Sequence, residues 1–329
     1  MKKVSVLLIL LAVAAVAYGG GRQEKNDRLQ IMTTTTIITD VVSQISGDRA
    51  DVSGLMAVGA NAHNYEPVPR DMARVEKADL VFVNGFGLEE GLLSFLDSAK
   101  TGRVVEVSSG IEVIGFDDSH DDHDQEADHD DHDEEADHDD HDDDDHHHEI
   151  DPHTWTSPRN VMVWVDNIVA ALEEADPANA GYYRERADLY RGELTRLDDE
   201  IRAALAAVPQ KDRILVADHK AFNYFARDYG FIVGGALIPR FSTNSEPTAR
   251  DLAELIRYIK EQDVKALFLG TTSSEAVKKM ANAVQGELGY PLPVVSVLTG
   301  SLLPAGQEGD DYQGFIRYNV KQIVRGLTR

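Results

Sequence analysis

The sequence predicts an α/β protein of two lobes, each a mostly parallel sheet with flanking helices, joined by one long rigid helix. Short β-branched segments alternate with amphipathic helical patterns over residues 28–157 and again over residues 211–329. One stripe of apolar residues at helical spacing continues for about 30 residues within residues 158–210. Two such halves on one stiff helix enclose a cleft, and we expect the binding site there.

Residues 1–17 predict an export signal, because two lysines precede an apolar run from Val4 to Val16 and small residues frame a cleavage site. We expect the mature protein to begin near Tyr18 and to work in the periplasm. An uncleaved anchor is the alternative, although the run is shorter than the roughly 20 residues of a spanning helix.

Composition excludes several classes of function. The chain contains no cysteine, which excludes disulfides, thiolate metal sites, cysteine nucleophiles and the lipid-bearing cysteine of a bacterial lipoprotein. The net charge of −26 is concentrated between Asp117 and Glu149, where 20 acidic residues lie without lysine or arginine, so the rest of the chain carries −6. No basic cluster is present, and nucleic acid and anionic membranes are not expected as partners.

The elements of the first lobe follow from local residue patterns. β-branched residues mark the strands, apolar spacings of three and four mark the helices, and one strand is apolar throughout, as a buried strand is. In order, we expect a strand at Ile31–Ile38, a helix at Asp40–Ile45, strands at Val52–Val58 and Leu80–Asn84 separated by a helix at Pro69–Lys77, a helix at Leu88–Leu96 and a strand at Val104–Val107.

Two helices are predicted between the lobes. Each has a capping residue before proline at the first helical position, Ser157 before Pro158 and Asp176 before Pro177. The second helix keeps one narrow apolar stripe for roughly 45 Å, long enough to span both lobes. A coiled-coil dimer is the alternative, but the heptads are too few, and we expect packing within a monomer. The stripe consists of Tyr183, Ala187, Tyr190, Leu194, Leu197, Ile201 and Leu205.

The second lobe repeats the alternation of strands and helices. One of its helices opens at Pro247 and places leucine and isoleucine residues on a single face. We expect strands at Ile214–Ala217, Phe231–Leu237, Ala266–Leu269 and Val294–Val297, and helices at Pro247–Ile259, Ser274–Val284 and Tyr312–Leu327.

Residues 117–149 contain three copies of a nine-residue acidic unit and a final run of three histidines. No residue there is apolar and larger than alanine, so burial cannot offset roughly 1 to 2 kcal/mol of backbone ordering entropy per residue, and we expect disorder. Histidines among carboxylates offer divalent cations many weak ligand sets, which predicts a metal-collecting loop, with a solvated linker as the alternative. The histidines are His120, His123, His129, His132, His138, His141, His146, His147 and His148.

Only three histidines lie outside this loop. His63 follows the second strand, His153 comes soon after the acidic loop, and His219 ends a strand of the second lobe. Ligands bind beyond the carboxyl ends of strands in open α/β sheets, so these positions are expected to converge. A lone histidine is more often a core or surface residue. Three neutral imidazoles without a thiolate, however, favour zinc at about 2.0 to 2.1 Å, whereas manganese favours carboxylates.

Several motifs across nearly all of the mature chain resemble the bacterial periplasmic receptors of ABC-type zinc and manganese uptake systems. The resemblance implies two α/β lobes bridged by a rigid helix, with a metal ion bound at their interface by His63, His153 and His219. It also implies a receptor that delivers its ion to a membrane permease with a cytoplasmic ATPase and takes no substrate but metal. The motifs are TTTTIITD, GANAHNYEPVPRD, DPHTW, DHKAFNYFARDYGF, SEPTARDLAELI and GDDYQGFIRYN.

The resemblance favours zinc but leaves the fourth ligand open. Many manganese members are similar but have glutamate at the position of His219, and zinc members insert an acidic His-rich loop before the second ligand. A late carboxylate ligand of the family aligns with Gly300 in VLTGSLL. Water, an imidazole of the loop, or Glu66 could instead complete the tetrahedron.

We expect a high-affinity receptor that captures Zn²⁺ outside the cytoplasmic membrane and carries it as cargo. A manganese receptor of the same type is one alternative. A secreted zinc hydrolase is another, because three histidines with an open position also describe catalytic zinc. The His-Glu-x-x-His and Gly-x-Ser-x-Gly signatures are absent from the sequence, so we do not expect an enzyme.

Overall fold

The computed structural model describes residues 28–89, 91–92, 95–96, 102–115, 150–243 and 247–328. The predicted signal at residues 1–17, the acidic loop at residues 117–149 with its nine histidines, and much of the helix predicted near residue 90 lie outside the described residues. Among the described residues, no helix has both the length and the apolar character needed to cross a membrane.

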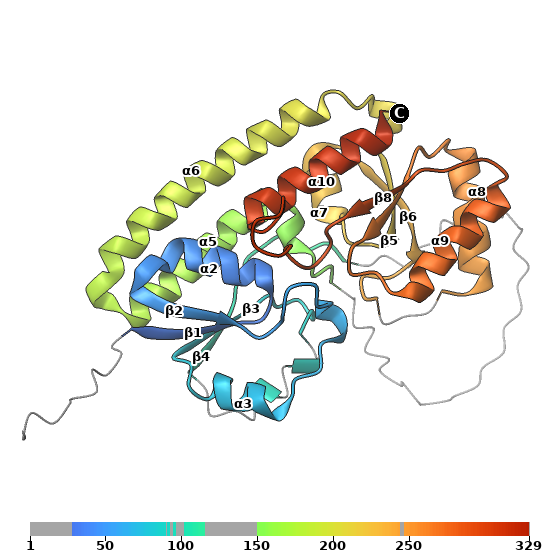
Figure 1. Ribbon diagram of the computed structural model, residues 1–329. Coiled ribbons are helices and arrows are strands. Elements are labelled where there is room, and N and C mark those ends of the chain that lie inside the picture. The colour runs from blue at the N-terminus through green and yellow to red at the C-terminus, as the bar shows by residue number, and fades with distance from the viewer. Residues whose placement is uncertain are drawn as a thin grey trace, which may run out of the picture.

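The first lobe is built on a parallel four-stranded sheet in the order β2-β1-β3-β4 (Figure 1). Parallel strands require crossover connections, and here helices supply them. The strands are β1 (Leu29–Thr33), β2 (Ala50–Gly54), β3 (Leu80–Val83) and β4 (Arg103–Glu106), and the described helices are α2 (Thr36–Ser46) and α3 (Pro69–Val75).

The expected strand at Ile31–Ile38 was wrong in its second half. The strand ends at Thr33 and α2 begins at Thr36, because the side chain of Thr35 accepts the backbone N–H of Ile38 at 3.2 Å and caps the helix. Ile38 then lies on the buried face of α2. The helix cap at Thr35 and the burial of Ile38 therefore outweigh the β propensity of the threonine run.

Helices α5 (Pro158–Ala175) and α6 (Ala180–Leu205) connect the lobes. The predicted cap of α5 is confirmed, since Ser157 Oγ accepts the N–H of Asn160 at 3.3 Å. Helix α6 begins three residues later than predicted. Its expected cap, Asp176, instead accepts the Asn179 amide at 2.7 Å, and Pro177–Asn179 form a separate 3₁₀ turn.

The long helix α6 contacts both lobes (Figure 1). Every residue of its predicted stripe is buried, and its 26 residues extend about 39 Å. Toward its first end, Arg186 Nε donates to the carbonyl oxygen of Gln44 in α2 at 2.6 Å. Toward its far end, Glu200 accepts from Arg317 Nε at 2.8 Å, in the last helix of the chain.

The second lobe has the same architecture, with a parallel sheet in the order β6-β5-β7-β8. Its last helix and last strand have the predicted bounds, and the other predicted elements differ only near their ends, but the short helix at Asn223–Tyr229 was not predicted. The strands are β5 (Ile214–His219), β6 (Ile232–Ile238), β7 (Leu267–Gly270) and β8 (Val294–Val297), and the helices are α7 (Asn223–Tyr229), α8 (Ala249–Glu261), α9 (Glu275–Leu288) and α10 (Tyr312–Leu327).

The two lobes share one hydrophobic core. It includes Phe82 from the first sheet, Phe268 from the second, Trp164 from α5 and Leu194 from α6. Each sheet also packs its other face against its own helices in a separate cluster. The inner faces of both sheets are therefore joined through the connecting helices, and this packing fixes how the two sets of strand ends face each other.

Candidate metal centre

His63 lies in the loop that follows β2. The short 3₁₀ turn Ala62–Asn64 carries it, and Asn61 Oδ1 starts this turn by accepting the N–H of His63 at 3.1 Å. The amide nitrogen of Asn61 donates to Thr243 Oγ1 of the second lobe at 2.9 Å. The loop that presents His63 is therefore anchored across the cleft.

His153 directly precedes the 3₁₀ turn Thr154–Thr156. Asn84, which follows β3, donates from its amide to the carbonyl oxygen of Pro152 at 2.9 Å. Ser108, just beyond β4, shares a 2.8 Å hydrogen bond with the Thr154 hydroxyl. Chain segments at the carboxyl ends of two first-lobe strands thus hold the residues on both sides of His153, where ligand sites of open sheets form.

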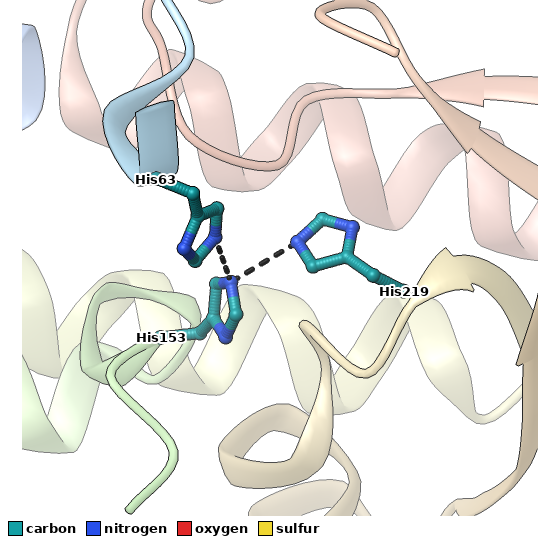
Figure 2. A group of neighbouring side chains, drawn as sticks. All are labelled: His63, His153 and His219. Atoms are coloured by element: carbon teal, nitrogen blue, oxygen red, sulfur yellow. Dashed lines mark hydrogen bonds between the residues drawn. The ribbon is translucent and has the colours of Figure 1, made fainter. Parts of the chain in front are cut away.

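His219 is the last residue of β5, an inner strand of the second sheet that is buried along its whole length. It therefore lies at the carboxyl end of its sheet, as its place in the sequence predicted. Its imidazole points toward His153 (Figure 2).

The three imidazoles converge between the lobes (Figure 2). Nε2 of His153 lies 3.0 Å from Nε2 of His63 and 3.1 Å from Nε2 of His219. One ring nitrogen from each residue lies within 4.8 Å of the others, and the side chains of His153 and His219 are buried. In the part of the chain that the structure describes, no other three His, Cys, Asp or Glu side chains converge in this way.

Two buried carboxylates orient two of the imidazoles. Oδ1 of Asp151 lies 2.7 Å from Nδ1 of His153, and Oδ1 of Asp218 lies 2.9 Å from Nδ1 of His219. Each oxygen also accepts the backbone N–H of the same histidine. An ionised carboxylate can only accept, so it keeps the ring proton on Nδ1 and leaves the lone pair of Nε2 directed at the centre.

The second oxygen of each carboxylate is also held. Oδ2 of Asp218 accepts the Gly270 N–H at 3.1 Å and the hydroxyl of Ser273. Oδ2 of Asp151 accepts the amide of Asn223 at 3.0 Å. Fixing the carboxylate fixes the imidazole, so these contacts preorganise the rings for an ion.

Burial sets the protonation of the site. It lowers the pKa of His63 and of His153 well below 6.5, and the neighbouring imidazoles lower both further. Burial raises the pKa of Asp151 to about 7, although hydrogen bonds to its carboxylate oppose the rise. Burial also acts against ionisation of Asp218, but the electrostatic interaction with the His219 ring and the hydrogen bonds to the carboxylate outweigh it and lower that pKa. His63 and His153 are therefore neutral near pH 7, as metal ligands must be.

Sequence reasoning did not identify the two orienting carboxylates. Asp218 directly precedes His219, and Asp151 lies two residues before His153. An acidic residue one or two positions before His153 and before His219 was the available signal. This local sequence signal does not reveal the contact of Asp151 with Asn223, because that contact joins residues 72 positions apart.

A small cavity of about 60 Å³ adjoins His63 and His219. Gly300 lines it, and a Cβ added at Gly300 would meet no heavy atom within 4 Å. The cavity is large enough for water, which needs roughly 10 to 15 Å³. Glu66, one of the alternatives for the fourth ligand, is exposed and lies outside the group of converging side chains.

Three imidazole nitrogens with a cavity beside them suit one tetrahedral ion. Zinc–nitrogen distances of about 2.0 to 2.1 Å place two tetrahedral ligands about 3.3 Å apart. The observed separations of 3.0 and 3.1 Å are close to that value. Two of the three nitrogen pairs therefore already have the spacing that a small tetrahedral divalent cation requires.

A family model described as zinc-uptake complex component A periplasmic matches residues 31–326. The manganese ABC transporter substrate-binding lipoprotein PsaA of Streptococcus anginosus is 27% identical over 340 residues, covering 100% of both chains. The manganese-binding lipoprotein MntA of Halalkalibacterium halodurans is 29% identical over 334 residues, again covering 100% of both.

Solved structures show the same fold. The periplasmic zinc-binding protein TroA of Treponema pallidum matches with a TM-score of 0.77 and 26% identity, covering 92% of this chain and 100% of that chain. A Mn-bound periplasmic metal-binding protein of Candidatus Liberibacter asiaticus matches with a TM-score of 0.74 and 24% identity, covering 91% and 100%. The likeness to this second protein concerns the fold alone.

Proposed function

Because this chain belongs to the family of periplasmic A components of zinc-uptake complexes, we propose that its cargo is Zn²⁺ and that His63, His153 and His219 bind it. The family consists of metal-binding receptors of ABC transporters, so the chain is a receptor for a metal ion and not an enzyme. The zinc hydrolase alternative is thereby set aside.

One observation carries the choice of zinc. The converging group consists of three imidazoles and, among the described residues, contains no carboxylate that faces the centre. Its two nearest carboxylates, those of Asp151 and Asp218, face the Nδ1 sides of His153 and His219 instead. Zinc tolerates an all-nitrogen set, whereas manganese favours carboxylate and water oxygens.

Manganese is the second candidate, and a specific observation supports it. PsaA of Streptococcus anginosus and MntA of Halalkalibacterium halodurans are both named for manganese. Their names do not outweigh the donor set of this chain, because the metal preference of a site depends on its own ligands. The two cargoes are separable by direct competition at the same site.

We further propose that the protein is exported by the segment at residues 1–17 and acts as a monomer in the periplasm. As the binding component of an ABC transporter, it passes its ion to a permease that a cytoplasmic ATPase drives. Several relatives are named lipoproteins, whereas this chain contains no cysteine that could carry a lipid. The histidines of residues 117–149 act as an accessory that collects ions.

The test is calorimetric titration of zinc against a competing chelator. Wild-type protein is expected to bind one zinc ion tightly, and deletion of residues 117–149 to preserve that ion. Alanine at His63, His153 or His219 should each weaken binding severely. Loss of all tight binding on deletion of the loop, with no effect of the three alanines, would refute the assignment. Parallel titration with Mn²⁺ compares the two cargoes.

A further inference from the structure

Asn223 reaches from the second lobe to a residue that orients a ligand of the first. It is the first residue of α7 and lies four residues after His219. Its Nδ2 donates to Asp151 Oδ2 at 3.0 Å and to the carbonyl oxygen of Lys220 at 3.3 Å. The amide is thus anchored in its own lobe while it holds the carboxylate of the other.

The next residue of α7 holds the same aspartate by its backbone. The hydroxyl of Tyr224 donates to the carbonyl oxygen of Asp151 at 2.9 Å, and the Tyr224 side chain is fully buried. The same hydroxyl accepts the N–H of Ile114 at 3.4 Å, in the first lobe. The beginning of α7 therefore contacts both the side chain and the main chain of Asp151.

The two carboxylates of the site differ in where their support comes from. Asp218 orients His219, and its donors Gly270 and Ser273 belong to its own lobe. Asp151 orients His153, but the donor to its second oxygen, Asn223, belongs to the opposite lobe. Moving the lobes apart would leave His219 oriented and would remove the support of His153.

The inference rests on the zinc-receptor function proposed above. We propose that Asn223 is a positioning residue that holds Asp151, and through it His153, in the binding orientation while the lobes are together. Lobe separation then weakens the site twice, because it withdraws His219 and also releases the carboxylate that orients His153. A movement of the lobes alters zinc affinity only if the ion is bound differently when the lobes are together and when they are apart.

The experiment measures zinc release from the full chain after mixing with excess chelator in a stopped-flow instrument. Asn223→Ala is expected to speed release about tenfold, the lower end of the effect of removing outer partners of a metal ligand. Asn179→Ala is the matched control. Its amide also donates to an aspartate carboxylate, that of Asp176 at 2.7 Å, but it lies beyond the far end of α5, about 27 Å along that helix from its start near His153, and release should be unchanged.

Two further variants separate positioning from a general loss of structure. Tyr224→Phe keeps the ring and removes only the hydroxyl, so it should also speed release while the protein remains folded. Asp151→Asn alone should speed release, and adding Asn223→Ala to it should change the rate little, because the two residues act through one contact. The visible spectrum of the Co²⁺ form should shift in Asn223→Ala and not in Asn179→Ala.

The outcomes are distinct. If wild-type protein lacks a tight zinc ion that depends on the three histidines, the proposed function fails and the inference fails with it. If wild type binds zinc but Asn223→Ala releases it at the wild-type rate, or if the effects of Asn223→Ala and Asp151→Asn simply add, only the inference is overturned.

Discussion

The indole Nε1–H of Trp155 donates to the carbonyl oxygen of Thr299 at 2.8 Å. Trp155 lies two residues after His153 in the first lobe, and Thr299 lies beside Gly300 in the loop after β8 of the second. The rings of Trp155 and His153 are also in edge contact, with centroids 5.2 Å apart. One side chain therefore contacts a proposed ligand and joins the two lobes.

Replacing Trp155 with Phe should lower the free energy of unfolding by about 1 to 3 kcal/mol, because the buried carbonyl of Thr299 loses its donor. The chain contains two tryptophans. The other, Trp164 on α5, donates its indole N–H to Ser108 Oγ at 3.1 Å, whereas the ring of Trp155 lies against that of His153. Zinc titration followed by fluorescence should therefore lose most of its signal in Trp155→Phe. A full fluorescence change on zinc titration of Trp155→Phe, where only Trp164 remains, would contradict the placement of Trp155 beside the metal. Urea unfolding measures the change in the free energy of unfolding.

Gly300→Asp should create a fourth ligand. A Cβ at this position meets no heavy atom within 4 Å, and the cavity beside it also touches His63 and His219. An added carboxylate oxygen suits manganese more than zinc, so the affinity ratio of manganese to zinc should rise at least about tenfold. Competition titrations of the two ions measure it. Gly286→Asp, on the open surface of α9, serves as the charge-matched control.

Zinc affinity should fall as the pH drops below about 7, and the proton responsible is that of Asp151. Burial raises the pKa of Asp151 to about 7 and lowers the pKa of His63 and His153 well below 6.5. The carboxyl therefore takes up a proton before these imidazoles do, and binding of a dication releases it.

Calorimetry in buffers of different ionisation enthalpy counts the protons released per zinc. Near pH 6.5 the count should approach one and should decrease toward zero above pH 8, and Asp151→Asn should abolish this dependence. Release of two or more protons at pH 6.5, or an unchanged count in the variant, would point to the imidazoles instead.

Thr35→Ala should lower the free energy of unfolding by about 1 kcal/mol, since Thr35 Oγ1 caps α2 through the N–H of Ile38. Chemical denaturation measures this change. Ser43→Ala is the control on the same helix, because its exposed hydroxyl only bonds back to the carbonyl of Thr39. Equal stability of Thr35→Ala and wild type would mean that the cap is not what separates strand from helix here.

The sequence allowed prediction of the fold and of which histidines meet, for identifiable reasons. The α6 stripe repeats at helical spacing, so its buried face was visible without coordinates. His63 and His219 follow or end strands, and the carboxyl ends of parallel strands form one edge. The prediction from local pattern was wrong at Thr33–Ile38, because β propensity and helix capping compete there within a few residues. It could not reveal the contact between Asn223 and Asp151, which only the packed lobes create.

The joint core has a consequence for how this protein unfolds. Phe82 and Phe268 belong to different sheets, yet both pack into one continuous apolar cluster through α5 and α6. Neither half retains its interior if the other melts, since each would expose apolar surface that its partner now covers. Despite its bilobed outline, the molecule should behave as one cooperative unit, with a single calorimetric transition and no separately stable half.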